Sequence, residues 1–179
     1  MATKHYLIIT DSNKEYVYVG TGSFGAAEKD QRKGHHFPGG SKDGNEDFKA
    51  TLVREVSEEF GTEWGTLVQH SDINKSFHKI KEGDKTLAEY YTLALHNPPE
   101  AGKLKEDSFP TNQGKYPGPR YAFDPAFSEI IKLKIKGGYF IPENGENTNI
   151  KYDNGSVKKY SNGWHKIAFE ALLNKVNQS

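Results

Sequence analysis

Apolar and polar residues near the start of the chain follow the pattern of short β-strands. His5 to Thr10 is an apolar run rich in residues that favour strands, and Glu15 to Val19 is a second such run. Asp11-Ser12-Asn13 between them is a turn signal. The sequence therefore predicts that the two runs pair as a β-hairpin.

A helical period follows in the middle of the chain. Large apolar residues recur at every fourth position, at Phe48, Leu52, Val56 and Phe60. This spacing predicts a helix with one apolar stripe facing the core. Asn45 or Asp47 can cap the start of this helix, and Gly61 can act as its C-cap.

The remaining elements are weaker in pattern but can still be placed. Gly65 to Gln69 is read as a strand, and a hairpin is predicted to join Ser76 to Ile80 with Thr86 to Leu95. The other predictions are a strand at Ile131 to Ile135, a hairpin turn at Asp153-Asn154-Gly155 and a terminal helix at Trp164 to Val176.

Two long segments are predicted to be loops. Asn97 to Pro125 is long and rich in Pro and Gly, which is typical of a functional or disordered loop. Thr21 to Gly34, with Lys29, Arg32 and Lys33, is either a solvated loop or a basic rim for phosphates.

Glu89 falls on the apolar face of the second hairpin arm. By the period of two it shares that face with Leu87, Tyr91, Leu93 and Leu95. A carboxylate among apolar neighbours needs a partner. Either Glu89 has a structural partner, or it is an additional acid that reaches a metal site.

Composition narrows the class of protein. The 179 residues suit a single domain spanning 1–179. Lys plus Arg and Asp plus Glu both number 24, so no net field attracts nucleic acid or a membrane surface, and we expect neither partner. The chain has no cysteine, which excludes disulfides and thiolate metal sites and fits a cytoplasmic location. No apolar run reaches transmembrane length. The oligomeric state stays open.

Charged residues gather in the second half of the predicted central helix, at Arg54, Glu55, Glu58 and Glu59. Each helical residue turns by roughly 100°, so Glu55 and Glu59 nearly eclipse and Glu58 lies one turn from Glu55. Carboxylates this close repel one another unless a cation neutralises them, and Mg²⁺ prefers oxygen ligands. The alternative is an acidic helix face exposed to solvent. An EF-hand is excluded, because Phe48 and Arg54 occupy its required Gly and Glu positions.

The stretch Gly40 to Thr62 resembles the Nudix box, G-x5-E-x7-R-E-U-x-E-E-x-G-U, where U is aliphatic. The fixed positions are filled by Gly40, Glu46, Arg54, Glu55, Glu58, Glu59 and Gly61. Val56 fills the first aliphatic position, and Thr62 departs from the pattern at the last. The preceding Phe37-Pro38-Gly39-Gly40 also resembles the segment that leads into such boxes.

The resemblance implies an α/β fold, a Nudix-type α/β/α sandwich with a mixed β-sheet between helices. It also implies Mg²⁺-dependent hydrolysis, with Mn²⁺ as a possible substitute. The bond cleaved would be the pyrophosphate bond in a nucleoside diphosphate linked to another group, giving a nucleoside monophosphate or a phosphorylated product. The expected partner is therefore a small-molecule nucleotide derivative. No downstream mark of a particular substrate class is present.

The resemblance further implies roles for individual residues. Glu55, Glu58, Glu59 and the carbonyl of Gly39 match metal ligands, and Glu55, Glu58 and Arg54 match catalytic positions, with Arg54 orienting a carboxylate. Gly39, Gly40 and Glu46 are expected at the substrate site. The general base is open among Glu55, Glu58, Glu89, Glu100 and Glu106.

Two other classes of function compete with the enzyme. A Nudix-fold nucleotide-binding or sensor module would bind without catalysis, but such modules usually lose box carboxylates and this chain keeps them all. A protein-interaction domain has no positive feature in the sequence.

Overall fold

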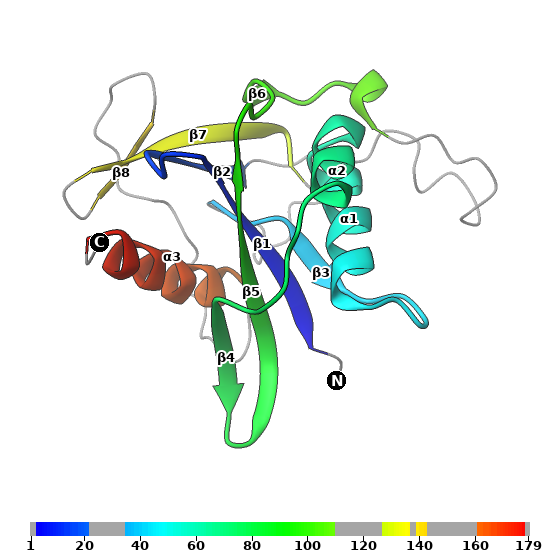
Figure 1. The fold of residues 1–179 in the computed structure, drawn as a ribbon, viewed down its shortest axis with the longest axis vertical. Coiled ribbons are helices and arrows are strands. Elements are labelled where there is room, and N and C mark those ends of the chain that lie inside the picture. Colours follow the sequence, from blue (N-terminus) through cyan, green and yellow to red (C-terminus); the bar gives the residue numbers. More distant parts are fainter. Residues whose placement is uncertain (1–2, 22–34, 110–126, 137–138, 143–160, 178–179) are drawn as a thin grey trace.

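The computed structural model describes residues 3–21, 35–109, 127–136, 139–142 and 161–177, and a mixed β-sheet forms its centre (Figure 1). The sheet has eight strands in the order β4-β5-β1-β2-β7-β6, while β3 pairs with β1 and β8 pairs with β7. The strands are β1 Lys4–Asp11, β2 Tyr16–Thr21, β3 Gly39–Ser41, β4 His78–Glu82, β5 Lys85–Leu95, β6 Gly102–Lys103, β7 Glu129–Lys136 and β8 Tyr139–Pro142. The helices are α1 Phe48–Glu59, α2 Thr62–Gln69 and α3 Ser161–Asn177, with a 3₁₀ turn, η2, at Glu106–Ser108.

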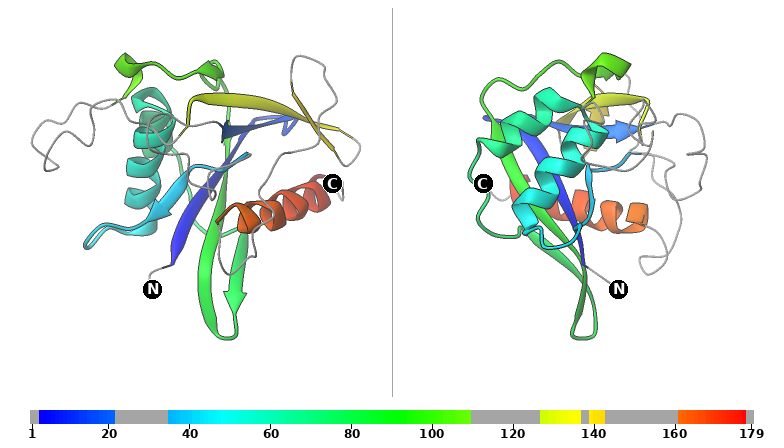
Figure 2. Two further views of the ribbon diagram at one scale, coloured as in Figure 1. Left: turned by 180° about the vertical axis from the view of Figure 1, so that it is seen from behind. Right: turned by 90° about the vertical axis from the view of Figure 1, so that its right-hand side faces the viewer.

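Helices cover both faces of this sheet, with α1 and α2 on one side and α3 on the other (Figures 1 and 2). The alternation of side chains along β1 explains the arrangement. Leu7 and Ile9 pack in the core under α1 and α2, whereas Tyr6 and Ile8 pack in the core under α3. Because β1 runs parallel to β5 and antiparallel to β2, the sheet is mixed. The predicted α/β fold with a mixed sheet between helices is therefore confirmed.

Most elements predicted from periodicity are present. The first hairpin forms β1 and β2, the second forms β4 and β5, and the alternating run near residue 131 forms β7. The four-residue stripe forms α1, in which Leu52, Val56 and Phe60 are buried. The terminal amphipathic run forms α3, whose Trp164, Ala168, Phe169 and Leu172 are buried against the sheet. Asp153-Asn154-Gly155 and the basic residues Lys29, Arg32 and Lys33 lie outside the described residues.

The strand predicted at Gly65 to Gln69 is wrong, because this segment belongs to α2. Trp64 and Val68 lie one helical turn apart and are both buried, in contact with the core that α1 also covers. Gly65 permits the two helices to approach closely, since a Cβ there would overlap the Ser57 side chain. Tertiary packing against α1 thus selects the helix.

The face assigned to Leu87 is also wrong. Leu87 packs in the core under α3, whereas Tyr91, Leu93 and Leu95 pack under α1 and α2. The pairing of β4 with β5 shifts register between Ile80 and Lys81, close to Leu87. Such an irregularity interrupts the strict alternation of faces on which the prediction depended.

None of the described helices is long and apolar enough to cross a membrane.

Candidate functional site

The site is built on α1, whose two ends are fixed locally. The side chain of Asp47 caps the start of the helix by accepting a hydrogen bond from the Ala50 N–H at 2.8 Å, so Asp47 rather than Asn45 is the N-cap. Phe60 is the C-cap residue, and Gly61 follows it with φ 113°, a conformation that favours glycine. The buried stripe then turns the charged edge of α1 toward β3, where the two elements are in contact.

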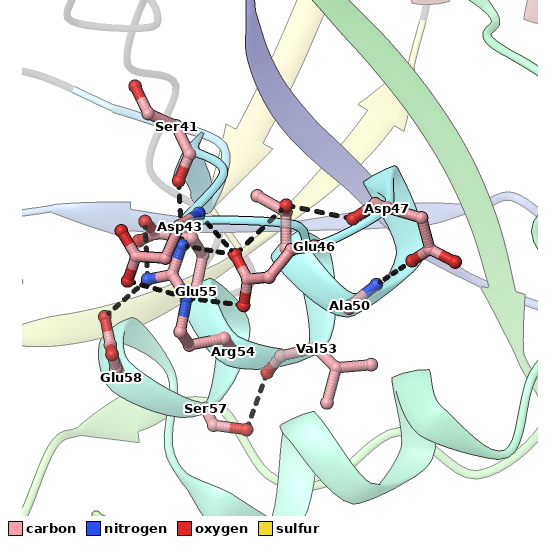
Figure 3. Close-up of polar contacts among 11 residues, drawn as sticks. Ser41, Asp43, Glu46, Asp47, Ala50, Val53, Arg54, Glu55, Ser57 and Glu58 are labelled. Atoms are coloured by element: carbon pink, nitrogen blue, oxygen red, sulfur yellow. Dashed lines mark hydrogen bonds and ion pairs between the residues drawn. The ribbon is translucent and has the colours of Figure 1, made fainter. Parts of the chain in front are cut away.

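Arg54 lies at the centre of the charged residues (Figure 3). Its Nε and Nη2 donate to the two carboxylate oxygens of Glu46 at 2.9 and 3.1 Å, and Nη2 also donates to the Ser41 carbonyl at 2.7 Å. Its Nη1 donates to Glu55 Oε1 at 3.1 Å and to Glu58 Oε2 at 3.3 Å. Only 9% of the Arg54 side chain is exposed. We call this group the Arg54 cluster: Ser41, Asp43, Glu46, Arg54, Glu55 and Glu58.

Glu46 supports the cluster from the loop before α1. One carboxylate oxygen accepts from the Asp43 backbone N–H at 2.6 Å and from the Thr51 hydroxyl at 3.3 Å. Burial opposes the ionisation of Glu46, but the hydrogen bonds from Arg54 and Asp43 outweigh it and lower the pKa of Glu46. Glu46 is therefore an ionised anchor for the Arg54 guanidinium. Sequence reasoning missed Asp43, Ser41 and Thr51, which no box position marks.

Gly39 and Gly40 on β3 lie beside two of the box carboxylates, Glu59 and Glu55 respectively. The Gly39 N–H donates to Glu59 Oε1 at 2.8 Å, which joins the end of α1 to the strand. A Cβ at Gly40 would lie 2.5 Å from Glu55 Oε1. Any larger residue at this position would therefore displace the Glu55 carboxylate. Residues far apart in sequence thus meet where β3 faces α1: Gly39 with Glu59, and Gly40 with Glu55.

Two of the carboxylates are poorly compensated. Glu58 Oε1 is buried and has no hydrogen-bond partner among the described residues. Burial raises the pKa of Glu55 to about 7; Arg54 opposes this shift and the charge of Glu58 adds to it. The single positive charge of Arg54 is shared among Glu46, Glu55 and Glu58, so it does not neutralise all three carboxylates.

The donor set fits a hard divalent cation. Glu55, Glu58 and Glu59 supply carboxylate oxygens, which Mg²⁺ prefers, and the unpartnered Glu58 Oε1 is an acceptor that a cation would satisfy. In the described part of the chain, no group of three or more His, Asp or Glu side chains is already arranged to hold a metal ion. Arg54 already donates to one oxygen each of Glu55 and Glu58, and the Gly39 N–H donates to one oxygen of Glu59, so a cation would have to bind alongside these donors.

The raised pKa of Glu55 predicts a pH-dependent difference in stability. An acid whose pKa is higher in the folded state than in the unfolded chain costs stability as it ionises. In EDTA, the melting temperature of Glu55→Gln relative to wild type is therefore expected to rise between pH 4.5 and 7, the window between the ordinary and folded pKa values. Thermal denaturation across this range measures the difference, and Glu170→Gln, at an exposed position on α3, is the control. A difference that stays flat or falls with pH contradicts the raised pKa.

The three candidate acids outside the box lie in different places. Glu89 on β5 has a partner, because the Tyr91 hydroxyl donates to its Oε2 at 2.7 Å. Glu100 lines a cavity of about 760 Å³ beyond the C-terminal end of α1, together with Phe60, Gly61 and Trp64. Glu106 begins η2. None of the hydrogen bonds described above joins these acids to the Arg54 cluster.

Comparison with known proteins gives distant likenesses to solved structures. No protein-family model and no curated protein matches the chain. Three similar solved structures are a MutT protein from Methanosarcina mazei (17% identity, TM-score 0.35), a MutT/nudix family protein from Enterococcus faecalis (16%, 0.48) and a candidate nudix hydrolase family member from Chromobacterium violaceum (13%, 0.38). The matches cover 55%, 98% and 99% of this chain, and 66%, 62% and 94% of those chains.

This chain spans less than two thirds of the length of the first two of these structures. The case for function therefore depends on the box and on the geometry of the Arg54 cluster.

Proposed function

We propose that this chain is a divalent-metal-dependent hydrolase of the Nudix type. Its reaction would cleave the pyrophosphate bond in a nucleoside diphosphate linked to another group. The observation that supports this most is that Gly39 and Gly40 on β3 lie beside Glu59 and Glu55 on α1, while a buried carboxylate oxygen of Glu58 has no partner among the described residues. A purely structural acidic helix would have no reason to bury an unsatisfied oxygen.

The residues of the site divide into metal ligands, a positioning residue and residues beside the substrate. Glu55, Glu58, Glu59 and the Gly39 carbonyl would hold Mg²⁺ or Mn²⁺. When bound, such a cation neutralises charge on pyrophosphate oxygens and lowers the pKa of water. Arg54 positions Glu55 and Glu58 through its Nη1, and its other nitrogens are themselves fixed by Glu46. Gly40 and Glu46 would lie beside the bound substrate.

Proton removal from the attacking water needs a base within hydrogen-bond reach of it. Glu55 and Glu58 both accept from Nη1 of Arg54, and one of these two acids would act as the base. Glu89, Glu100 and Glu106 lie outside the Arg54 cluster and are not assigned as the base.

The test is metal dependence. Nucleoside diphosphate derivatives are incubated with the protein and Mg²⁺, and phosphate is measured after a phosphatase is added. Activity on at least one derivative is expected to vanish in EDTA and to return with Mg²⁺ or Mn²⁺. The carboxylates and the pyrophosphate are both negatively charged, so a cation is needed between them. Full activity in chelator would refute the proposal.

A nucleotide-binding module without catalysis is the second candidate. It is favoured by one observation: the described acids are engaged with Arg54 and Gly39 rather than arranged around a cation site. Tight binding of a nucleotide with no turnover in Mg²⁺ or Mn²⁺ would select this alternative.

Wider expectations stay predictions. These are a single domain across residues 1–179, a cytoplasmic location and a small-molecule nucleotide partner, with no membrane or nucleic-acid partner.

A further inference from the structure

A second polar group lies on the α1 face of the sheet, outside the Arg54 cluster. His5 on β1 is paired with Glu89 on β5 and with Gly40 on β3. Residues paired across neighbouring strands point to the same face, and such strands lie about 4.8 Å apart. Gly40 faces Glu55 on α1, so this face is the α1 face. Glu89, His5 and Gly40 thus form a row across the sheet that ends at Glu55; we call it the Glu89 row.

Hydrogen bonds orient the polar groups of the row. The Tyr91 hydroxyl donates its only proton to Glu89 Oε2 at 2.7 Å. Its longer contact of 3.4 Å with His5 Nδ1 therefore has His5 as the donor. The second oxygen of Glu89 then keeps its acceptor sites for a ligand.

Aromatic packing keeps this arrangement in place. The rings of Phe48 and Tyr91 are stacked, with centroids 4.7 Å apart and an angle of 6° between their planes. Tyr91 is buried, while Glu89, His5 and Phe48 are half-buried. The hydroxyl that holds Glu89 is therefore fixed, and the carboxylate itself stays within reach of a ligand.

These acceptors suit a hydroxyl-bearing ligand better than a phosphate. Lys79 on β4 is the sheet partner of Glu89, but among the described residues no Lys or Arg forms an ion pair with this carboxylate, so a phosphate there would lie against a negative charge. A carboxylate accepts well from the hydroxyls of a ribose, as acidic residues do in dinucleotide sites. Glu89 lies two strand spacings from Gly40, roughly 10 Å, which is within the span of a ribose 5′-diphosphate.

We propose that Glu89, positioned by Tyr91, binds the 2′- and 3′-hydroxyls of a ribonucleoside whose diphosphate lies at Gly39, Gly40 and the box carboxylates. This inference rests on the proposed function and narrows its substrates to ribonucleoside compounds. Glu89 is then a specificity residue rather than the base, and Tyr91 is a positioning residue.

Calorimetric titration tests the inference without depending on turnover. ADP and GDP are compared with their 2′,3′-dideoxy counterparts in Mg²⁺, and the nucleotides are checked for integrity by chromatography afterwards. The wild type is expected to bind the ribose form roughly tenfold to a hundredfold more tightly for at least one base, as for hydrogen bonds to a charged group. Glu89→Gln, which keeps one acceptor oxygen but loses the charge, should lower this ratio several-fold without weakening the dideoxy form, and Tyr91→Phe should lower it in part. Glu170→Gln, on the opposite face, should keep it.

The outcomes separate this inference from the proposed function. Equal binding of ribose and dideoxy forms by the wild type, no binding of either, or a full preference kept in Glu89→Gln would overturn the ribose assignment. Hydrolysis of a diphosphate without ribose preference would also overturn it and leave the proposed function standing. A ribose preference that depends on Glu89, in a protein without turnover, would support the assignment while refuting the hydrolase.

Discussion

Glu58→Gln and Glu59→Gln are each expected to fold like the wild type and to lose roughly a hundredfold or more in turnover. The two substitutions keep side-chain volume and remove one negative charge. Glu58 has one oxygen without a partner in the described part of the chain, and its charge raises the pKa of Glu55, so removing that charge relieves repulsion. Glu59 accepts from the Gly39 N–H, and the amide oxygen of glutamine can still accept there. Free energies of unfolding in EDTA should therefore lie within roughly 1 kcal/mol of the wild type.

The measurement is paired, because stability and turnover should respond differently. Unfolding is followed in EDTA, and turnover is measured in saturating Mg²⁺ on a diphosphate that the wild type cleaves. Glu170→Gln serves as the matched control, since its side chain is exposed on α3. A solvated acidic helix would show little change in either quantity. If both variants keep near wild-type turnover, these residues do not hold the metal.

Arg54→Lys is expected to lose both stability and turnover. Lysine keeps the charge but has no planar fork, so it cannot donate at once to Glu46, Glu55, Glu58 and the Ser41 carbonyl. The cluster is mostly buried, and leaving its acids without donors should cost roughly 2 to 3 kcal/mol. Turnover should fall with it, because Glu55 and Glu58 are no longer fixed relative to β3.

A double-mutant cycle with Glu46→Gln isolates the anchoring contact. Glu46 accepts from two nitrogens of Arg54, so the double variant should be less destabilised than the sum of the single variants. Additive losses would show that Glu46 does not anchor Arg54. Wild-type stability and turnover in Arg54→Lys would contradict the positioning role altogether.

Local patterns explain why much of the fold could be predicted. The apolar run of β1, the period of two in β5 and the period of four in α1 are properties of short segments, and where a period holds, a side chain's face follows directly from it. The cap at Asp47 and the glycine after α1 are equally local. Where a local pattern was short or irregular, as at Gly65 to Gln69 and at Leu87, the prediction was wrong, because packing against α1 and a register shift decided the outcome.

The sequence by itself determined the periodic strands, the amphipathic helix and the spacing of the box acids along one helix edge. Only the tertiary structure decided which groups those acids meet. Arg54 with Glu46 and Ser41, Glu59 with Gly39, and Glu89 beside His5 all join residues that are distant in sequence. Such contacts depend on how β3 and β5 pair with β1 and how α1 crosses them, since hydrophobic burial fixes strand order and register for the chain as a whole.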